Sequence, residues 1–249
     1  IFLTIMTLCN AGDHMVVSSQ LYGGTVNLFR LTLPKFGIKT TFVKPRDTDG
    51  FKKAIQPINK GFFGELVGNP GIELMNMPEV SNIAKEAGIP LIIDSTYQTP
   101  YLCRPFEHGA DLVVHSLTKW MSGNGSSMAG ILVEGGTFDW MQNDKFPSMT
   151  EPYEGYHGLS FAEEFGPTAF TMMARAEGMR DMGPCLAPQN AWNILHGLET
   201  LSLRMEKHCS NALKMVEYLS NHESVAWVSH ASAPGHPDKE LAEKILPKG

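Results

Sequence analysis

One lysine near the middle of the chain has the neighbours that a reactive amine needs. Lys119 ends the run Ser-Leu-Thr-Lys at residues 116–119, which follows the apolar residues 112–114 and precedes a glycine-containing loop, residues 122–125. A lysine amine attacks a carbonyl group when burial or nearby positive charge lowers its pKa. The hydroxyls of the same run can donate hydrogen bonds to a phosphate oxygen. The segment therefore predicts a desolvated, carbonyl-binding amine beside a phosphate site, whereas the general rule for lysines predicts only an exposed side chain at a strand end.

Strands and helices alternate along the first half of the chain, and these elements would position Lys119. Short, continuously apolar runs predict buried strands at residues 15–17, 38–43, 62–67, 91–93 and 112–114, and a sixth run follows at 129–133. Helical stretches lie between them, among them residues 77–87 and 101–109. This alternation is typical of a mostly parallel sheet covered by helices on both faces. We therefore predict an α/β fold.

Polar residues stand where these strands end. In open α/β sheets, ligands bind just beyond the carboxyl ends of the strands. The residues in such positions are Tyr22, Asn69, Asp94, Thr96, Ser116, Thr118 and Lys119. We expect them to converge on one crevice although they are far apart in the sequence. No Gly-x-Gly-x-x-Gly follows the first strand, so the dinucleotide fingerprint is absent.

The second half of the chain is less regular. Residues 134–167 are interpreted as loops, a helix is predicted from Gln189 to about Ser220, and residues 225–228 are predicted to form a strand. An apolar stripe on that helix predicts packing against the core or a second domain; it comprises Trp192, Leu195, Leu198, Met205, Cys209, Val216 and Leu219. We assign residues 1–188 to a large domain, and residues 189–249 to a connecting helix and the start of a second domain. The chain lacks an initiator methionine and opens inside an apolar stretch, so we expect truncation at both ends.

Composition narrows the class of protein. The chain of 249 residues has a net charge of −6 and no cluster of lysines and arginines, which argues against a nucleic-acid partner. Its 4 cysteines are far apart, which argues against a zinc site and favours the reducing cytoplasm. No metal is expected. The apolar opening, residues 1–8, is too short to span a bilayer, so no membrane partner is expected either.

The motifs around Lys119 resemble those of one enzyme family. Ser-x-Thr-Lys behind an apolar strand is similar to the lysine segment of the Cys/Met metabolism family of pyridoxal-phosphate enzymes, the cystathionine γ-synthase family, which has fold type I. Leu117 stands where that family usually has alanine. The other matching motifs follow in family order and include residues 22–25, 68–70 and 94–96. The later segments 156–161 and 197–201 resemble most the O-acetylhomoserine sulfhydrylase branch, often called homocysteine synthase.

The resemblance implies roles for the strand-end residues. Lys119 would carry pyridoxal 5'-phosphate as a Schiff base and, once released, act as the general base. Asp94 would pair with the pyridine nitrogen and keep it protonated, which makes the ring an electron sink. Tyr22 would stack on the ring and could assist proton transfer. The remaining implied contacts are Asn69 near the phenolic oxygen, Thr96 as a hydroxyl on the cofactor side, and Ser116 and Thr118 on the phosphate.

The resemblance also implies a reaction. The expected activity is γ-replacement on O-acetyl-L-homoserine with sulfide or a thiol, which gives L-homocysteine and acetate in methionine biosynthesis. A sister activity, cystathionine γ-synthase or γ-lyase, and a non-catalytic scaffold remain alternatives. The family suggests a homotetramer, a dimer of dimers with shared active sites. Its phosphate clamp would precede Ile1 and its substrate-carboxylate arginine would follow Gly249, so residues 1–249 alone are expected to bind the cofactor weakly and turn over poorly.

Overall fold

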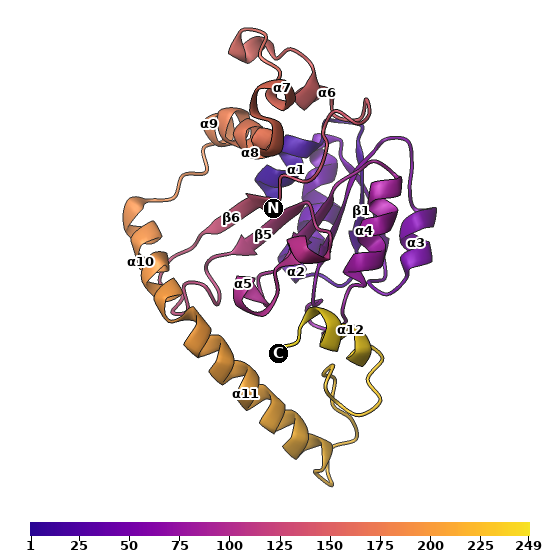
Figure 1. Ribbon diagram of the computed structural model, residues 1–249, viewed down its shortest axis with the longest axis vertical. Helices are drawn as coiled ribbons and strands as arrows, with labels where there is room; N and C mark the ends of the chain where they lie inside the picture. Colours follow the sequence, from indigo (N-terminus) through magenta and orange to yellow (C-terminus); the bar gives the residue numbers. More distant parts are fainter.

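A single six-stranded sheet forms the centre of the computed structural model, which describes all residues from 1 to 249 (Figure 1). The strands are β1 (His14–Ser18), β2 (Lys39–Val43), β3 (Asn59–Glu65), β4 (Leu91–Asp94), β5 (Leu112–Ser116) and β6 (Gly130–Glu134). Their order across the sheet is β2-β1-β3-β4-β5-β6. All pairs are parallel except β5 and β6, which are antiparallel. The predicted mostly parallel α/β fold is confirmed.

Helices alternate with the first five strands, and the remaining helices follow β6. They are α1 (Phe2–Leu8), α2 (Gly23–Asn27), α3 (Thr48–Lys53), α4 (Met77–Glu86), α5 (Thr99–Leu102), α6 (Pro147–Thr150), α7 (Phe161–Phe165), α8 (Ala169–Met173), α9 (Arg180–Met182), α10 (Pro188–Glu199), α11 (Leu201–Ser220) and α12 (Lys239–Ile245). Helix α2 continues directly into a π-helix and a 3-10 turn that reach Phe36. None of the helices has the length and apolar character needed to cross a bilayer.

The core lies on both faces of the sheet, as two neighbouring residues of β3 illustrate. Phe62 packs edge-on against Phe51 of α3 with ring centroids 5.3 Å apart, and Phe63 packs against Phe29 at 5.0 Å. Consecutive side chains of a strand point to opposite faces, so the two contacts lie on opposite sides. All four rings are fully buried. Burial on both faces explains why the central strands β1, β3, β4 and β5 are mostly apolar along their length rather than alternating.

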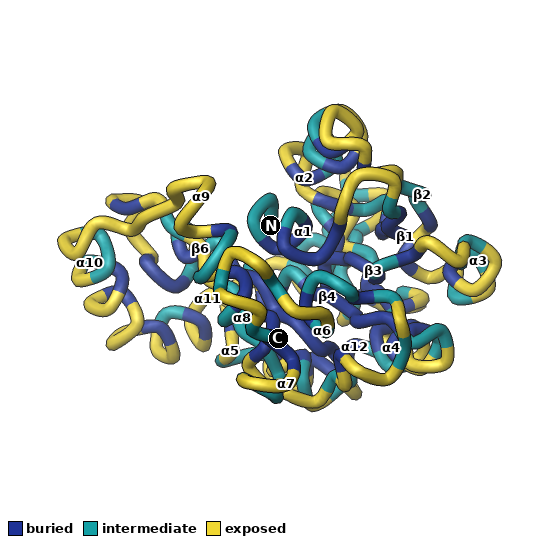
Figure 2. Tube along the Cα trace, turned by 90° about the horizontal axis from the view of Figure 1, so that it is seen from above, coloured by how far each residue is buried: buried dark blue, intermediate teal, exposed yellow.

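The predicted helix from Gln189 to Ser220 is wrong in one respect. It is two helices, α10 and α11, that meet at Thr200, where φ is −106° and ψ is 5°. Figure 1 shows the pair extending away from the sheet, and Figure 2 shows exposed residues along α10. The predicted packing of the apolar stripe is observed only in part: Met205 is buried in a cluster with Leu117 and Met121, whereas Trp192 and Leu195 are 56% and 60% exposed.

Two further sequence expectations need correction. Residues 101–109 do not form one helix: α5 ends at Leu102 and a 3-10 turn runs from Pro105 to His108. Proline cannot continue the helical hydrogen bonds and keeps the preceding Arg104 extended. Residues 225–228 form no strand. Trp227 is 78% exposed there, so this stretch lacks the partner strand and apolar cover that strand formation needs.

Candidate active site

The strand ends surround one cleft of about 660 Å³. Six of the seven predicted residues line it: Tyr22, Asn69, Asp94, Thr96, Ser116 and Lys119. They come together because β3, β4 and β5 run parallel in matching register, with Glu65 opposite Asp94 and Asp94 opposite Val114. The polar residues that end these strands therefore lie along one edge of the sheet. Thr118 is the one predicted residue outside the lining.

Asp94 is the buried acid of the cleft. Its Oδ1 accepts two hydrogen bonds from Thr96, at 2.9 Å from the backbone N–H and at 2.6 Å from the hydroxyl. No residue of the chain donates to Oδ2, which is left to receive another donor. Burial raises the pKa of Asp94, while the bonds from Thr96 and the nearby His115 oppose that rise. The carboxylate is thus desolvated, and a cation at Oδ2 would stabilise its charged form.

The hydroxyl of Thr96 is already occupied. It donates its proton to Asp94 and accepts the backbone N–H of Ser116 at 2.8 Å. A hydroxyl has only one proton to donate, so Thr96 has none left for a ligand. Through these bonds Thr96 connects the ends of β4 and β5 and also orients the carboxylate of Asp94.

His115 lies behind Asp94 and does not line the cleft. Its Nδ1 is 2.9 Å from the carbonyl oxygen of Ser95. A carbonyl only accepts hydrogen bonds, so Nδ1 carries the proton. Burial lowers the pKa of His115, although the bond to Ser95 and the charge of Asp94 oppose the change. The imidazole is therefore a buried, neutral and hydrogen-bonded group.

Lys119 lines the cleft but is exposed, so the predicted desolvation of its amine is wrong for this chain. Its Nζ makes no hydrogen bond or ion pair with other residues and is free to bond to a ligand. The backbone around it is held more firmly. Gly123 donates its N–H to the Lys119 carbonyl at 2.8 Å, and Arg204 of α11 donates to the Trp120 carbonyl at 2.7 Å. The exposed side chain therefore projects from a fixed turn.

The two hydroxyls near Lys119 differ in availability. Ser116 lines the cleft, and its hydroxyl has no partner in the chain. The hydroxyl of Thr118 accepts the Ala129 N–H at 3.0 Å and donates to the Ala129 carbonyl at 3.3 Å. Ser116 can therefore donate to a phosphate directly, whereas Thr118 would first have to give up its bond to Ala129.

Tyr22 lies at the start of α2 with 56% of its surface exposed. Its ring crosses the backbone of Gly24 so closely that a Cβ at position 24 would lie 2.7 Å from the ring. Real Cβ contacts are essentially never that short, so glycine is needed for the ring to keep this position. The exposed ring of Tyr22 can line the cleft in this position because Gly24 has no side chain.

Sequence reasoning missed Glu65, which also lines the cleft. It is only 7% exposed, and its Oε1 accepts the backbone N–H of Tyr22 at 2.7 Å. Burial raises the pKa of Glu65 to about 7, while backbone bonds from Tyr22 and Asn69 oppose the rise and the charge of Asp94 adds to it. The sequence feature that could have identified Glu65 is its position as a carboxylate inside the apolar run 62–67. Tyr97, Gln98 and Trp120 were missed as lining residues too.

The mostly parallel sheet and the cleft at its strand ends are consistent with the α/β fold of the fold type I class of pyridoxal-phosphate proteins. The model of the family described as "Cys/Met metabolism PLP-dependent enzyme" matches residues 1–249. The chain belongs to this family.

Named relatives agree with this assignment. The chain is 45% identical to the O-acetyl-L-homoserine sulfhydrylase of Leptospira meyeri, over 99% of this chain and 58% of that protein. It is 43% identical to the homocysteine synthase of Schizosaccharomyces pombe, over 100% of this chain and 58% of that protein. The chain thus spans less than two thirds of the length of the curated relatives it matches.

A solved structure extends the comparison. The crystal structure of a Campylobacter jejuni protein assigned as O-acetylhomoserine (thiol)-lyase superposes with a TM-score of 0.94 at 35% identity, covering 99% of this chain and 61% of that one. That crystal structure contains a pyridoxyl-lysine-5'-monophosphate residue.

The cleft residues fit pyridoxal phosphate, the cofactor of the family. The free amine of Lys119 can bond to an aldehyde, and Oδ2 of Asp94 can accept a hydrogen bond from a protonated ring nitrogen. The Ser116 hydroxyl can donate a hydrogen bond to a phosphate oxygen. Tyr22 and Asn69 line the same cleft. Lys119 is the only cationic side chain that lines the cleft.

Proposed function

We propose that the protein catalyses γ-replacement on O-acetyl-L-homoserine, with sulfide or a thiol as the nucleophile and L-homocysteine and acetate as the products with sulfide. This reaction would serve methionine biosynthesis. One observation carries the proposal: the unpaired amine of Lys119 shares a cleft with a buried Asp94 that keeps one carboxylate oxygen open. Similarity to a sulfhydrylase and a homocysteine synthase supports the choice of substrate.

Lys119 would have two roles. Pyridoxal phosphate, when bound, supplies an aldehyde that bonds to amines and a ring that withdraws electrons from Cα of the substrate. The Lys119 amine would hold the aldehyde between turnovers and release it when the substrate's amine takes its place. The released amine would then remove the proton from Cα and return it later in the cycle. Its exposure on a fixed turn supports this shuttling, because the side chain can move while its backbone stays in place.

The other residues would bind and orient. Asp94 would hold a proton on the ring nitrogen through Oδ2, while Thr96 keeps the carboxylate aimed. Tyr22 would stack on the ring from its position over Gly24. Ser116 would donate to the phosphate, and Asn69 would donate to the phenolic oxygen. Thr96 would act through Asp94 rather than on the cofactor itself.

The bond changes balance without an oxidant. A proton leaves Cβ, and the bond from Cγ to the acetate oxygen breaks with its electron pair on acetate. The sulfur of sulfide then bonds to Cγ, and protons return to Cβ and Cα. Lys119 is the only cationic side chain lining the cleft, so it is our candidate for moving these protons.

We further propose a cytoplasmic homo-oligomer, a dimer of dimers with shared sites. A dianionic phosphate is best bound by several donors and cations, and this chain offers one lysine side chain in the cleft. Further cations would have to come from beyond these residues. The free cysteines support a reducing compartment. We keep the division into a large domain, residues 1–188, and a connecting helix with the start of a second domain, residues 189–249, as a proposal.

The test combines spectroscopy with mapping. The protein is mixed with pyridoxal phosphate, its absorbance is recorded, and the adduct is reduced with borohydride before peptide mapping. A visible band with the pyridoxyl group on Lys119 is expected. Products are then measured with O-acetyl-L-homoserine and sulfide, cysteine or no nucleophile, and homocysteine should dominate with sulfide. An adduct on another lysine would refute the assignment, and so would the absence of any adduct both in residues 1–249 and in a version extended at both ends.

A further inference from the structure

The loop between β3 and α4, residues 66–75, carries Asn69 into the cleft; we call it the Asn69 loop. It is folded back on itself. Val67 and Leu74 form an isolated antiparallel bridge. The N–H of Gly68 donates to the Glu73 carbonyl at 2.9 Å, and Met75 donates to Leu66 at 3.1 Å. Because the two arms of the loop are bonded together, the position of Leu74 sets the position of Asn69.

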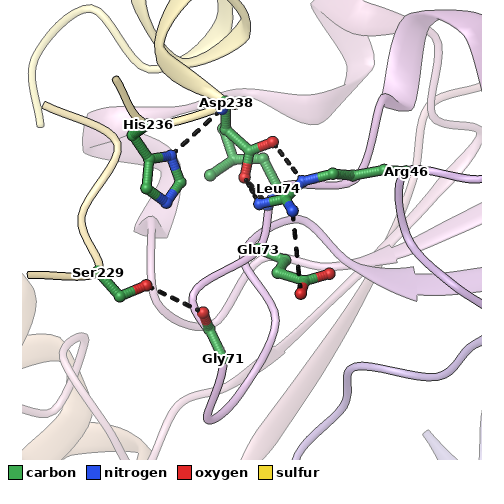
Figure 3. A network of polar contacts seen from close by, with 7 residues as sticks. All are labelled: Arg46, Gly71, Glu73, Leu74, Ser229, His236 and Asp238. Atoms are coloured by element: carbon green, nitrogen blue, oxygen red, sulfur yellow. Dashed lines mark hydrogen bonds and ion pairs between the residues drawn. The ribbon is translucent and has the colours of Figure 1, made fainter. Parts of the chain in front are cut away.

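Asp238, which is 164 residues further along the chain, holds the returning arm of this loop (Figure 3). Its Oδ2 accepts the backbone N–H of Leu74 at 2.9 Å. The guanidinium of Arg46 donates to both carboxylate oxygens at 2.6 Å. Asp238 is only 3% exposed. Burial by itself would raise the pKa of Asp238, but the bonds from Arg46 and Leu74 outweigh it and hold the pKa below its usual value, so the group stays charged.

Weaker contacts surround this central one. Arg46 lies 3.9 Å from the carboxylate of Glu73, and the Ser229 hydroxyl lies 3.5 Å from the Gly71 carbonyl. Figure 3 shows these residues around the loop, with Ser229 beside Gly71 and Arg46 entering from the opposite side. The segment before α12 therefore contacts the Asn69 loop at two residues, Gly71 and Leu74, and Arg46 contacts a third, Glu73. The bidentate pair of Arg46 with Asp238 is the strong interaction that holds this group together.

We propose that Asp238 and Arg46 are a positioning pair that sets where Asn69 lies in the cleft and thereby sets the affinity for pyridoxal phosphate. The proposal rests on the proposed function, in which Asn69 contacts the cofactor. Neither residue lines the cleft, so the pair acts only through the loop. A loop that is already ordered binds its ligand without an added ordering cost, whereas a loosened loop lowers the apparent affinity.

Three variants separate the contributions. Asp238→Ala removes both the ion pair and the acceptor for Leu74. Asp238→Asn keeps an oxygen for Leu74 but loses the charge, and Arg46→Lys keeps the charge but loses the bidentate fork. Glu107→Gln is the matched control, because it breaks an exposed ion pair, Arg104 with Glu107 at 2.9 Å, far from the loop in sequence.

Three measurements are made on each purified variant. Hydrogen exchange without cofactor should quicken in residues 66–75 of Asp238→Ala, while the β5 peptide stays like wild type. Titration with pyridoxal phosphate should give a Kd about tenfold higher for Asp238→Ala, equivalent to about 1.4 kcal/mol, and smaller increases for Asp238→Asn and Arg46→Lys. The value of kcat at saturating cofactor should stay within about twofold of wild type, since the pair does not touch the reacting atoms. The control should match wild type in all three.

The outcomes are decisive in both directions. Unchanged exchange in the loop, or an unchanged Kd, would overturn the proposal. Exchange that quickens equally across the whole sheet, with Kd unchanged, would show a purely structural pair. If Asp238→Ala does not fold, Arg46→Lys decides by the same two criteria. Failure of the proposed function is recognised separately, because wild type itself would then form no adduct on Lys119.

Discussion

The carboxylate of Glu65 accepts the backbone N–H of Tyr22 at 2.7 Å, while its Cα lies opposite that of Asp94 in the neighbouring strand. Glu65 is thus bonded to the backbone of Tyr22 and lies beside Asp94, the buried acid of the cleft. Two carboxyl groups on adjacent strands cannot both ionise without cost. The pKa of Glu65, raised to about 7 chiefly by burial, reflects that arrangement.

Replacing Glu65 with glutamine should change how stability depends on pH. Folding raises the pKa of Glu65 from 4.5 to about 7, so the native state holds an extra proton in this window and stability falls as the pH rises through it. Glutamine does not titrate. Relative to wild type, the free energy of unfolding of Glu65→Gln should therefore improve by about 1 kcal/mol or more between about pH 5 and about pH 8.

Urea unfolding of the cofactor-free protein at three pH values would measure this. Glu164→Gln, which alters an exposed carboxylate, serves as the control and should keep a constant difference from wild type. A difference between Glu65→Gln and wild type that does not vary with pH would contradict the prediction.

Lys119→Ala should remove both the attachment point and the proposed base. We expect no reducible adduct and a loss of turnover of at least about 10²-fold, the range typical of a lost general base. The folded structure should persist, because the Lys119 amine has no partner within the chain. Borohydride reduction with peptide mapping and a homocysteine assay would measure the effect, and Lys214→Ala would be the exposed-lysine control. Normal turnover by Lys119→Ala would exclude its proposed role.

Asp94→Asn should lower activity without lowering the stability of the cofactor-free protein. Asparagine can still accept both bonds from Thr96 through Oδ1, but it cannot hold a proton on a ring nitrogen by charge. Because burial raises the pKa of Asp94, its charge disfavours folding as the pH rises. At about pH 8 the cofactor-free variant should therefore melt at or above the temperature of wild type, while kcat falls by about 10²-fold or more.

Calorimetry and steady-state kinetics on the same preparations would check both halves of this expectation. A clear drop in melting temperature would mean that the charged form of Asp94 stabilises the fold. That result would contradict the electrostatic account of the site.

Gly24→Ala should weaken cofactor binding by moving one ring. The new Cβ would lie 2.7 Å from the ring of Tyr22, so the ring must shift, whereas a Cβ at Gly23 would meet nothing within 4 Å. Both positions lie in α2, so their backbone effects are closely matched. We expect the Kd for pyridoxal phosphate to rise about threefold to tenfold, or about 0.7–1.4 kcal/mol, in Gly24→Ala only. Equal Kd values in the two variants would argue against stacking by Tyr22.

Much of the fold followed from local patterns. Apolar runs predicted all six strands of the sheet. For the four central strands the physical reason is burial on both faces of a parallel sheet, which requires apolar residues throughout. The positions of Asp94, Ser116 and Lys119 at strand ends then followed from topology, since parallel strands end along one edge. The helix break at Thr200 and the exposed stripe of α10 did not follow, because periodicity identifies a helix face but not what covers it.

The amino-acid sequence by itself determined which residue types could meet at the edge of the sheet and which family they resemble. Only the tertiary structure decided what each group is free to do. Thr96 gives its proton to Asp94, Thr118 bonds to Ala129, and Glu65 holds the backbone of Tyr22. Hydrogen-bond partners and burial depend on residues far apart in the chain, as Leu74 and Asp238 are. These properties arise only when the folded chain brings such residues into contact and excludes water from between them.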